Sequence, residues 1–314
     1  MKLTHIRDVL AVAEFGSLRA AGRHLGIAQP AVTRSIHEIE RELGVSLFER
    51  HARGVRLTAM GEIFLRRAEA VRGELRRATE EIEQLKGRST GQVFVCLSIA
   101  SSIALLPWAM TAFRKRYPEA LLKVSEGLFQ AAETDIMEGR LDFYIGPYDP
   151  AISATQLSVE KLFDNERIVV ARKDHPLSGA TSLHDLEEAE WVHVGLAPRR
   201  IDGPRTSEAD FDNMFAEMGM PPPKISMHVY SVLSAVIAVA NSDLLAILPR
   251  LWLESPASGE RLTSLMVAEH MPAPPICIIR RHDMPLTPMA EYLCDMMRRA
   301  ASHYVHRTQS QAAA

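Results

Sequence analysis

Cysteine is scarce in this chain. Cys96, Cys277 and Cys294 are an odd number and form no Cys-x-x-Cys motif. This pattern argues against a disulfide framework and against a zinc site. Each cysteine lies in an apolar run, which favours buried and inert thiols, because free cysteine is among the most buried residue types. A pair of redox-sensing thiols is the alternative that the sequence leaves open.

Long apolar runs and common enzyme motifs are also lacking. The longest apolar stretch, Val232 to Ala240, is too short to cross a bilayer, and the N-terminal segment lacks the cleavage site of a secretory signal. The sequence contains no GxSxG, HExxH, P-loop or GxGxxG motif. We therefore expect a cytoplasmic protein that is not an enzyme, has no catalytic residues, needs no cofactor or metal, and does not bind membranes.

What the chain does have is an ordinary globular composition. Its 314 residues, 47% hydrophobic and 24% charged, suffice for two or three domains. The net charge of −3 hides an asymmetry: residues 1–90 carry 16 basic and 12 acidic side chains, and the remainder carries 20 and 27. A basic head on an acidic body favours nucleic-acid binding by the N-terminal end.

Residues 3–43 have the spacing of three short helices. The pattern predicts a first helix that ends at Gly16 and a second helix over 18–25 that Ser17 can cap. Gly26 supplies a turn before a third helix that begins near Gln29. The face of the third helix expected to be buried comprises Val32, Ile36, Ile39 and Leu43, and the opposite face carries Gln29, Pro30, Thr33, Arg34 and His37.

That opposite face has residue types that read DNA bases. Gln can pair bidentately with adenine, Arg can pair with guanine, and the Thr methyl group can touch the methyl group of thymine. Two helices joined at a glycine turn, the second with such a face, form a helix-turn-helix. A plain three-helix bundle with a solvated face is the alternative.

The segment after the third helix predicts a basic wing. Residues 47–58 read as a short hairpin around Gly54 with arginines on both sides. Such a hairpin lies along the phosphates or enters the minor groove of DNA. We expect Arg53 to make this contact, whereas Arg50 could instead pair with a carboxylate of the protein.

The run from Phe15 to Leu65 resembles the DNA-binding domain of LysR-type transcriptional regulators. The resemblance implies a winged helix-turn-helix whose Gln29, Pro30, Thr33, Arg34 and Arg53 lie at double-stranded DNA. Ala28 stands where many members have Ser or Thr, so no hydroxyl contact to phosphate is expected there. The matching residues are Gly16-Ser17-Leu18, Ala20-Ala21, Leu25, Gln29-Pro30-Ala31-Val32-Thr33, Ile36, Leu43-Gly44, Leu47-Phe48-Glu49-Arg50 and Leu57-Thr58-Ala59-Met60-Gly61.

A heptad-like stripe follows the wing. The segment that carries this stripe, from about Thr58 to Leu85, would form a helix about 40 Å long at 1.5 Å per residue. Such a helix cannot bury the stripe by itself, so we expect the same helix of a second copy to cover it. Packing of the helix on the chain's own domain is the alternative. Such a dimer would place two recognition helices on a pseudo-palindromic operator. The family resemblance implies the same pairing and, in many members, a homotetramer. The apolar residues recur at spacings of four and three, at Phe64, Ala68, Val71, Leu75, Ala78, Ile82 and Leu85.

From Gly91 onward strands alternate with helices, which predicts an α/β fold with a largely parallel sheet. The order of elements suggests a second lobe inserted into the first, and it resembles the periplasmic-binding-protein-like effector domain of the same family. We expect a DNA-binding domain over 1–58, a linker helix and hinge over 59–90, and an effector-binding domain over 91–308. Lobe I would comprise 91–162 and 268–308, and lobe II 163–267.

The ends of the predicted strands carry the candidate effector-binding residues. In open α/β sheets, ligands bind beyond the carboxyl ends of strands, where helix N-termini point. Ser98, Ser101 and Ser102 follow the first strand, and Ser231 precedes a helix of lobe II. Their hydroxyls suit a small anion such as a carboxylate or sulfonate, although ordinary helix capping is the alternative for each serine. The other candidate lining residues are Ala100, Phe129, Gly146, Pro147, Val194 and Gly195.

Residues 280–288, with Leu105-Leu106-Pro107, are similar to the subgroup of the family that includes the regulator of toluenesulfonate degradation. That similarity implies an aromatic acid as effector. We expect a transcription regulator in which the effector closes the cleft between the lobes and changes DNA bending or contact with RNA polymerase. A redox-switched regulator of the same architecture and a solute-binding protein without regulatory role are the alternatives.

Overall fold

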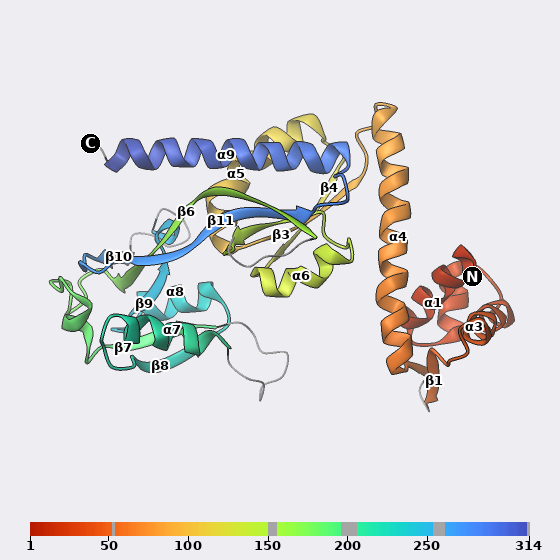
Figure 1. The fold of residues 1–314 in the computed structure, drawn as a ribbon, viewed down its shortest axis with the longest axis horizontal. Helices are drawn as coiled ribbons and strands as arrows, with labels where there is room; N and C mark the ends of the chain where they lie inside the picture. The colour runs from red at the N-terminus through yellow and green to blue at the C-terminus, as the bar shows by residue number, and fades with distance from the viewer. Residues whose placement is uncertain (52–53, 150–155, 196–205, 254–260, 313–314) are drawn as a thin grey trace.

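The computed structural model describes residues 1–51, 54–149, 156–195, 206–253 and 261–312. A small helical head, a long helix and an α/β body follow one another along the chain (Figure 1). Within the described ranges, none of the helices combines the length and the apolar character needed to cross a membrane.

The head consists of three helices and a hairpin. Helix α1 (Leu3–Phe15) ends at Gly16 in the left-handed conformation, and the Ser17 hydroxyl caps α2 (Leu18–Leu25) by accepting from the amide of Ala20 at 3.2 Å. Helix α3 (Gln29–Leu43) follows, and strand β1 (Phe48–His51) pairs antiparallel with β2 (Gly54–Leu57). The predicted helix ends and hairpin are confirmed.

One residue of the predicted buried stripe on α3 was wrong. Val32, Ile36 and Ile39 are buried, but Leu43 is 42% exposed. It lies in the last turn of α3, directly before Gly44, where the helix ends.

Helix α4 (Ala59–Leu85) closes the head and then extends to the body. The Thr58 hydroxyl caps it by accepting from the amide of Gly61 at 3.0 Å. Near its start, Phe64 and Ala68 pack on Ile6 and Leu10 of α1. The rest of α4 runs along lobe I (Figure 1), so a single rigid element carries the head and reaches the body.

The body is organised around a seven-stranded sheet in the order β10-β6-β11-β5-β3-β4, with β9 also pairing to β6. Helices α5 (Ile99–Arg116) and α9 (Pro288–Ala312) cover one face of its lobe I part, and α6 (Phe129–Met137) covers the other. The strands are β3 (Gln92–Leu97), β4 (Leu121–Glu126), β5 (Phe143–Pro147), β6 (Leu157–Arg172), β9 (Ala246–Pro249), β10 (Leu262–Leu265) and β11 (Met271–Arg281).

The prediction of a largely parallel sheet was wrong. Among the described strands of this sheet, β3 pairs in parallel with β4 and β5, whereas the pairings of β11 with β5 and β6, and of β6 with β9 and β10, are antiparallel. Strands β6 and β11 are long because each runs through both lobes, and they run in opposite directions because the chain enters lobe II along one and returns along the other. Alternation of strands and helices predicts parallel pairing only within a lobe.

Lobe II adds a small parallel pair, β7 (Glu190–Val194) with β8 (Lys224–Val229), between helices. One hydrophobic cluster centres on Trp191 and Phe215, and a second on Val236 and Trp252. The remaining elements are α7 (Thr206–Glu217), α8 (Val232–Ala240) and the 3-10 turns η1 (Leu183–Leu186) and η2 (Arg250–Trp252).

Candidate functional site

The first candidate site is the outer face of α3. Gln29, Pro30, Arg34 and His37 are exposed. Thr33 is half-buried, and its hydroxyl donates to the carbonyl of Gln29 at 3.0 Å. Because that bond holds the hydroxyl against the helix, the methyl group is the part of Thr33 available for an apolar contact. The face therefore offers an amide, a guanidinium and a methyl group, the groups that read base edges.

The hairpin stands beside this helix. The amide of Val55 donates to the carbonyl of Gly16 at 3.0 Å, which ties β2 to the turn between α1 and α2. Arg50 and Arg56 are exposed on β1 and β2. Arg53, the residue expected to contact the DNA backbone, lies outside the described residues.

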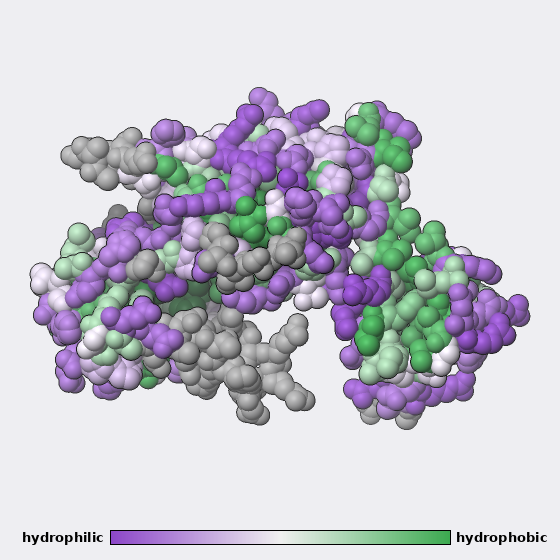
Figure 2. Space-filling model, viewed as in Figure 1, coloured by the Kyte–Doolittle hydropathy of each residue, from purple (hydrophilic) through white to green (hydrophobic). Residues whose placement is uncertain are grey.

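The second candidate surface is the apolar stripe of α4. Leu75, Ile82 and Leu85 are 46%, 54% and 74% exposed, and Val71 and Ala78 are exposed as well. Hydrophobic residues follow α4 in Figure 2. An exposed stripe of this kind, about four turns long at 3.6 residues per turn, marks an association surface.

The third candidate site lies at the start of α5. Ser98 is the N-cap: its hydroxyl accepts from the amide of Ser101 at 3.2 Å and lies 2.9 Å from the Ser101 hydroxyl. Both serines are buried, as is Ala100, whereas Ser102 is half-buried. Capping, the alternative reading, accounts for the Ser98 hydroxyl, so Ser102 is the serine better placed to meet a ligand.

Phe129, Gly146 and Pro147 gather at the same edge of the sheet. Phe129 is buried and packs edge-on against Tyr144 and Tyr148, with ring centroids 5.7 and 4.8 Å apart. Gly146 is buried, and Pro147 is half-buried. The amide of Ser98 donates to the carbonyl of Ile145 at 2.8 Å, which fixes the α5 cap beside these residues.

Gly146 is required by its neighbours. A Cβ atom there would lie 2.1 Å from the Tyr144 hydroxyl oxygen and 2.8 Å from the Ser98 Cβ. We expect Gly146→Ala to lower the free energy of unfolding by about 1–3 kcal/mol, the usual cost of overpacking a core. Urea unfolding measures it, with Gly179→Ala as the matched control, because a Cβ at Gly179 meets nothing within 4 Å. Equal midpoints for the two variants would contradict the prediction.

In lobe II, Val194 and Gly195 end β7, and Ser231 precedes α8. The Ser231 side chain is exposed and makes no capping hydrogen bond. Val194 and Val232 pack in the same hydrophobic cluster as Ile99 and Ile103 of α5. The structure thus brings the α5 start of lobe I against the β7 and α8 ends of lobe II.

Sequence reasoning missed Ile99, Ile103 and Tyr144 at this meeting of the lobes. Nothing local in the sequence indicates that Ile99 and Ile103 of α5 pack on the other lobe. Within the described part of the chain, no group of three or more His, Cys, Asp or Glu side chains is arranged to hold a metal ion.

The three cysteines are buried, and no disulfide joins them. Cys96 on β3 and Cys277 on β11 are separated by β5. Two strand spacings put their Cα atoms at least about 9–10 Å apart. A disulfide tolerates at most about 7 Å between Cα atoms. Cys294 lies in the core on the opposite face of the sheet.

These thiols should be unreactive in the folded protein. Burial raises the pKa of Cys277 to about 11 and that of Cys294 to about 12, and also raises the pKa of Cys96. At pH 8 we expect labelling by a disulfide reagent at least roughly 100-fold slower in the native protein than in urea, since the thiolate is the reactive form. Rapid reaction of one thiol per native chain with the disulfide reagent would instead support the redox interpretation.

Comparison with known proteins identifies both ends of the chain. Residues 3–62 match the model "Bacterial regulatory helix-turn-helix protein, lysR family", and residues 86–302 match "LysR substrate binding domain". The transcriptional regulator TdcA of Escherichia coli K12 is 25% identical over 304 residues, covering 96% of this chain and 94% of TdcA. GbpR of Azospirillum brasilense is 24% identical and covers 98% of this chain and 89% of GbpR.

Solved structures share the fold. The LysR family regulator CbnR superposes with a TM-score of 0.67 at 22% identity, covering 96% of this chain and 99% of CbnR. A structure of full-length CbnR with its target DNA gives the same TM-score at 21% identity, covering 96% of this chain and 100% of that one. Full-length BenM aligns with a TM-score of 0.53 at 23% identity, covering 96% of this chain and 97% of BenM. At these identities the likeness establishes the architecture of head, long helix and α/β body.

Proposed function

The chain belongs to the LysR family of bacterial helix-turn-helix transcriptional regulators, and we propose that it binds a pseudo-palindromic operator as a homo-oligomer under the control of a small organic acid. It is a regulator and not an enzyme. The observation that carries the proposal is the exposed α3 face, which presents Gln29 and Arg34 beside a basic hairpin. We place its action in the cytoplasm, where operator DNA and RNA polymerase, a further partner, are found.

For DNA binding we assign base contacts to Gln29, Pro30, Thr33, Arg34 and His37, and a backbone or minor-groove contact to Arg53. The solved complex of CbnR with its target DNA, a protein of the same fold, supports this arrangement. The domain limits that go with it are 1–58 for the head, 59–90 for the linker and 91–308 for the effector-binding domain.

For self-association we propose that the α4 stripe pairs with the α4 stripe of a second copy. Further exposed apolar side chains support a tetramer: Trp108 and Leu121 on lobe I, and Leu233 and Ile237 on lobe II, are each at least 41% exposed. Exposed apolar side chains outside the α4 stripe allow a second kind of contact, as a tetramer of paired dimers needs.

For the effector we propose an aromatic acid held between the lobes, as the similarity to the toluenesulfonate-regulator subgroup implies. Its anion would meet Ser102, the exposed Ser231 and the N-terminal end of α5. Ile99, Ile103 and Val194 would supply apolar contact for the ring. The remaining lining residues would be Ser98, Ala100, Ser101, Phe129, Gly146, Pro147 and Gly195.

Two alternatives are disfavoured by specific observations. A redox switch needs reactive thiols that can approach each other, whereas Cys96 and Cys277 are buried and separated by a strand. A solute-binding protein without regulatory role would have no use for the head and the long α4.

Selection of DNA from a random-sequence library tests the regulator proposal without a known operator. We expect recovery of sites with two inverted half-sites about one helical turn, or a multiple of it, apart. Recovery of no common sequence would refute sequence-specific binding.

Thermal unfolding against benzoate, 4-toluenesulfonate, butyrate and succinate tests the effector class. A ligand at 100 times its dissociation constant should stabilise the protein by about 2.7 kcal/mol. Ser102→Ala should reduce the shift given by an aromatic acid, and a shift confined to the aliphatic acids would refute the aromatic class.

A further inference from the structure

Helix α4 has two opposite faces. The residues that contact lobe I lie about half a turn around the helix from the exposed apolar stripe, because each residue advances about 100°. The apolar stripe is thereby left open while the other face meets the chain's own body. The residues of that second face, which we call the docking face, are Arg66, Glu69, Gly73, Arg77 and Gln84.

Arg77 is the centre of the docking face. It is only 8% exposed, and its guanidinium donates to the carbonyl of Gly139, in the turn between α6 and β5. It also pairs with Glu74 on α4, and its Nη1 lies 3.7 Å from the Asp142 carboxylate. Gly73 permits this close approach, because a Cβ there would already lie 3.4 Å from the Gly139 oxygen.

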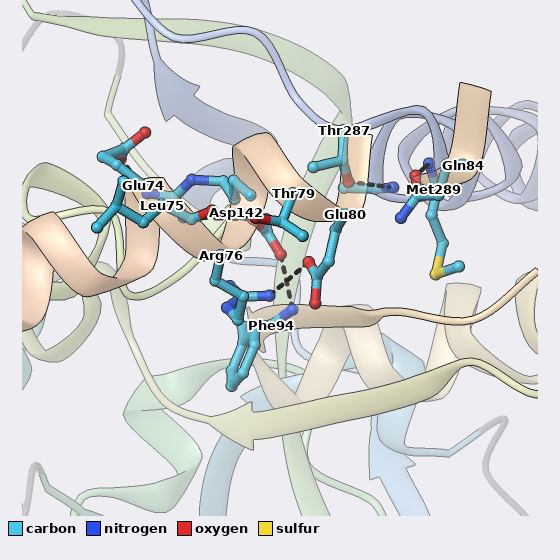
Figure 3. Close-up of polar contacts among 12 residues, drawn as sticks. Glu74, Leu75, Arg76, Thr79, Glu80, Gln84, Phe94, Asp142, Thr287 and Met289 are labelled. Carbon is cyan, nitrogen blue, oxygen red and sulfur yellow. Dashed lines mark hydrogen bonds and ion pairs between the residues drawn. The ribbon is translucent and has the colours of Figure 1, made fainter. Parts of the chain in front are cut away.

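Asp142 anchors this contact in the sheet. Its carboxylate accepts from the amide of Phe94 at 2.8 Å, and its own amide donates to the Phe94 carbonyl at 2.8 Å (Figure 3). Burial raises the pKa of the Asp142 carboxyl, whereas the Phe94 amide and the Arg77 cation favour its charged form. Arg77 therefore compensates a buried charge that stands at the entrance of β5. The strands β3 and β5 carry Ser98 and Gly146 at their opposite ends.

A second contact reaches helix α9. The Gln84 side-chain oxygen accepts from the amide of Met289 at 2.9 Å (Figure 3). Met289 lies in the first turn of α9, where an amide has no partner within its own helix. A side chain of α4 thus caps a helix of lobe I, and the Met289 amide reports whether the docking face is closed.

The Arg76 guanidinium of α4 also lies over the Phe94 ring of β3, 4.5 Å from its centroid, but the other ion pairs between α4 and lobe I are weak. The Arg140 guanidinium lies 3.3 Å from the Glu69 carboxylate, and the Arg66 guanidinium lies 3.8 Å from the Glu138 carboxylate. Of these four side chains, only that of Glu138 is nearly buried. Exposed ion pairs contribute little stability. Polar interfaces separate more readily than apolar ones, so the apolar stripe is the permanent side of α4 and the docking face is the side that can open.

We propose that Arg77 is a lock that holds α4 on the chain's own lobe I and must release before the head can turn relative to the body. The regulatory meaning of this movement rests on the proposed function, whereas the lock itself rests only on the contacts between α4 and lobe I. Arg77 acts as a positioning residue, because it touches neither the α3 face nor the candidate effector residues.

Hydrogen exchange of the full-length protein tests the lock. Arg77→Met should make the amides at the start of α9 exchange roughly tenfold faster, because the joint opens more often. Arg72→Met is the matched control: Arg72 is exposed on the same helix, and its loss should leave the exchange unchanged. Where Arg77→Met alone does not fold, the double variant with Asp142→Asn removes the uncompensated charge and retains an acceptor for the Phe94 amide. Wild-type exchange in a folded Arg77 variant would overturn the lock.

Small-angle X-ray scattering supplies the second readout. The double variant should have a larger radius of gyration than the wild type at the same oligomeric state, whereas Arg72→Met should not. If the double variant shows faster hydrogen exchange at the start of α9 but the radius of gyration of the wild type, Arg77 does not control the orientation of the head. Failure to select any DNA site would sink the regulator proposal but would not alter either of these measurements.

Discussion

Replacing Leu75 by Asp in the middle of α4 should dissociate the assembly and abolish tight DNA binding. In a two-fold helix pair, each substitution removes a leucine contact and places a carboxylate in an apolar interface, and symmetry doubles the effect. We expect the dissociation constant of the dimer to rise by roughly 10³-fold or more, or about 4 kcal/mol. A separated head would hold a single half-site, so affinity for a selected operator should fall by at least about 100-fold.

Analytical ultracentrifugation and a DNA-binding titration measure the two effects. Leu75→Met is the control, because it retains an apolar side chain of similar volume and should leave both unchanged. The unfolding temperature of the isolated chains should change little, since Leu75 is 46% exposed in the single chain. A Leu75→Asp protein that keeps the wild-type oligomeric state would show that α4 is covered in another way.

The local structure of the head could be predicted from the sequence because short-range chemistry determines it. Gly16 and Gly26 end helices in the left-handed conformation, and Ser17 caps the next helix through its own hydroxyl. These contacts join residues a few positions apart. The exposed face of α3 followed from the same periodicity, since the positions opposite Val32 and Ile36 had to face outward.

The long strands of the body could not be predicted in the same way. β6 and β11 pair residues about a hundred positions apart, such as Ile279 with Val159. Their continuation from one lobe into the other depends on how the lobes are joined, which no local pattern encodes. The docking face of α4 was missed for the same reason: Arg77 contacts Gly139 and Asp142, which lie more than sixty positions away in the sequence.

The candidate effector residues fall between these cases. Strand ends and a helix start located Ser98 correctly, but its hydroxyl proved to be engaged by the amide of Ser101. A capping serine and a binding serine have the same sequence signature, and only the hydrogen bonds distinguish them. Ser102 and Ser231, whose side chains are more accessible, are therefore the better positions for substitution.

Replacing Arg34 by Ala should remove sequence discrimination, whereas replacing Arg56 by Ala should weaken binding to every sequence alike. Arg34 is exposed near the start of α3, where a guanidinium can reach a base edge, and Arg56 is exposed on the hairpin, where we expect a contact to the backbone. A lost bidentate base contact costs about 1–3 kcal/mol. With two half-sites, Arg34→Ala should reduce the affinity ratio between a selected site and random DNA by roughly 30-fold to 10⁴-fold.

Titrations against selected and random DNA at several salt concentrations separate the two roles. Arg56→Ala should leave the affinity ratio unchanged and make the salt dependence shallower by about one counterion for each hairpin, because each lost phosphate contact releases fewer ions. Arg34→Ala should lower the affinity ratio between selected and random DNA, with little change in the affinity for random DNA. If both variants lose only non-specific affinity, α3 lies across the backbone and the base-reading face must be sought elsewhere in the head.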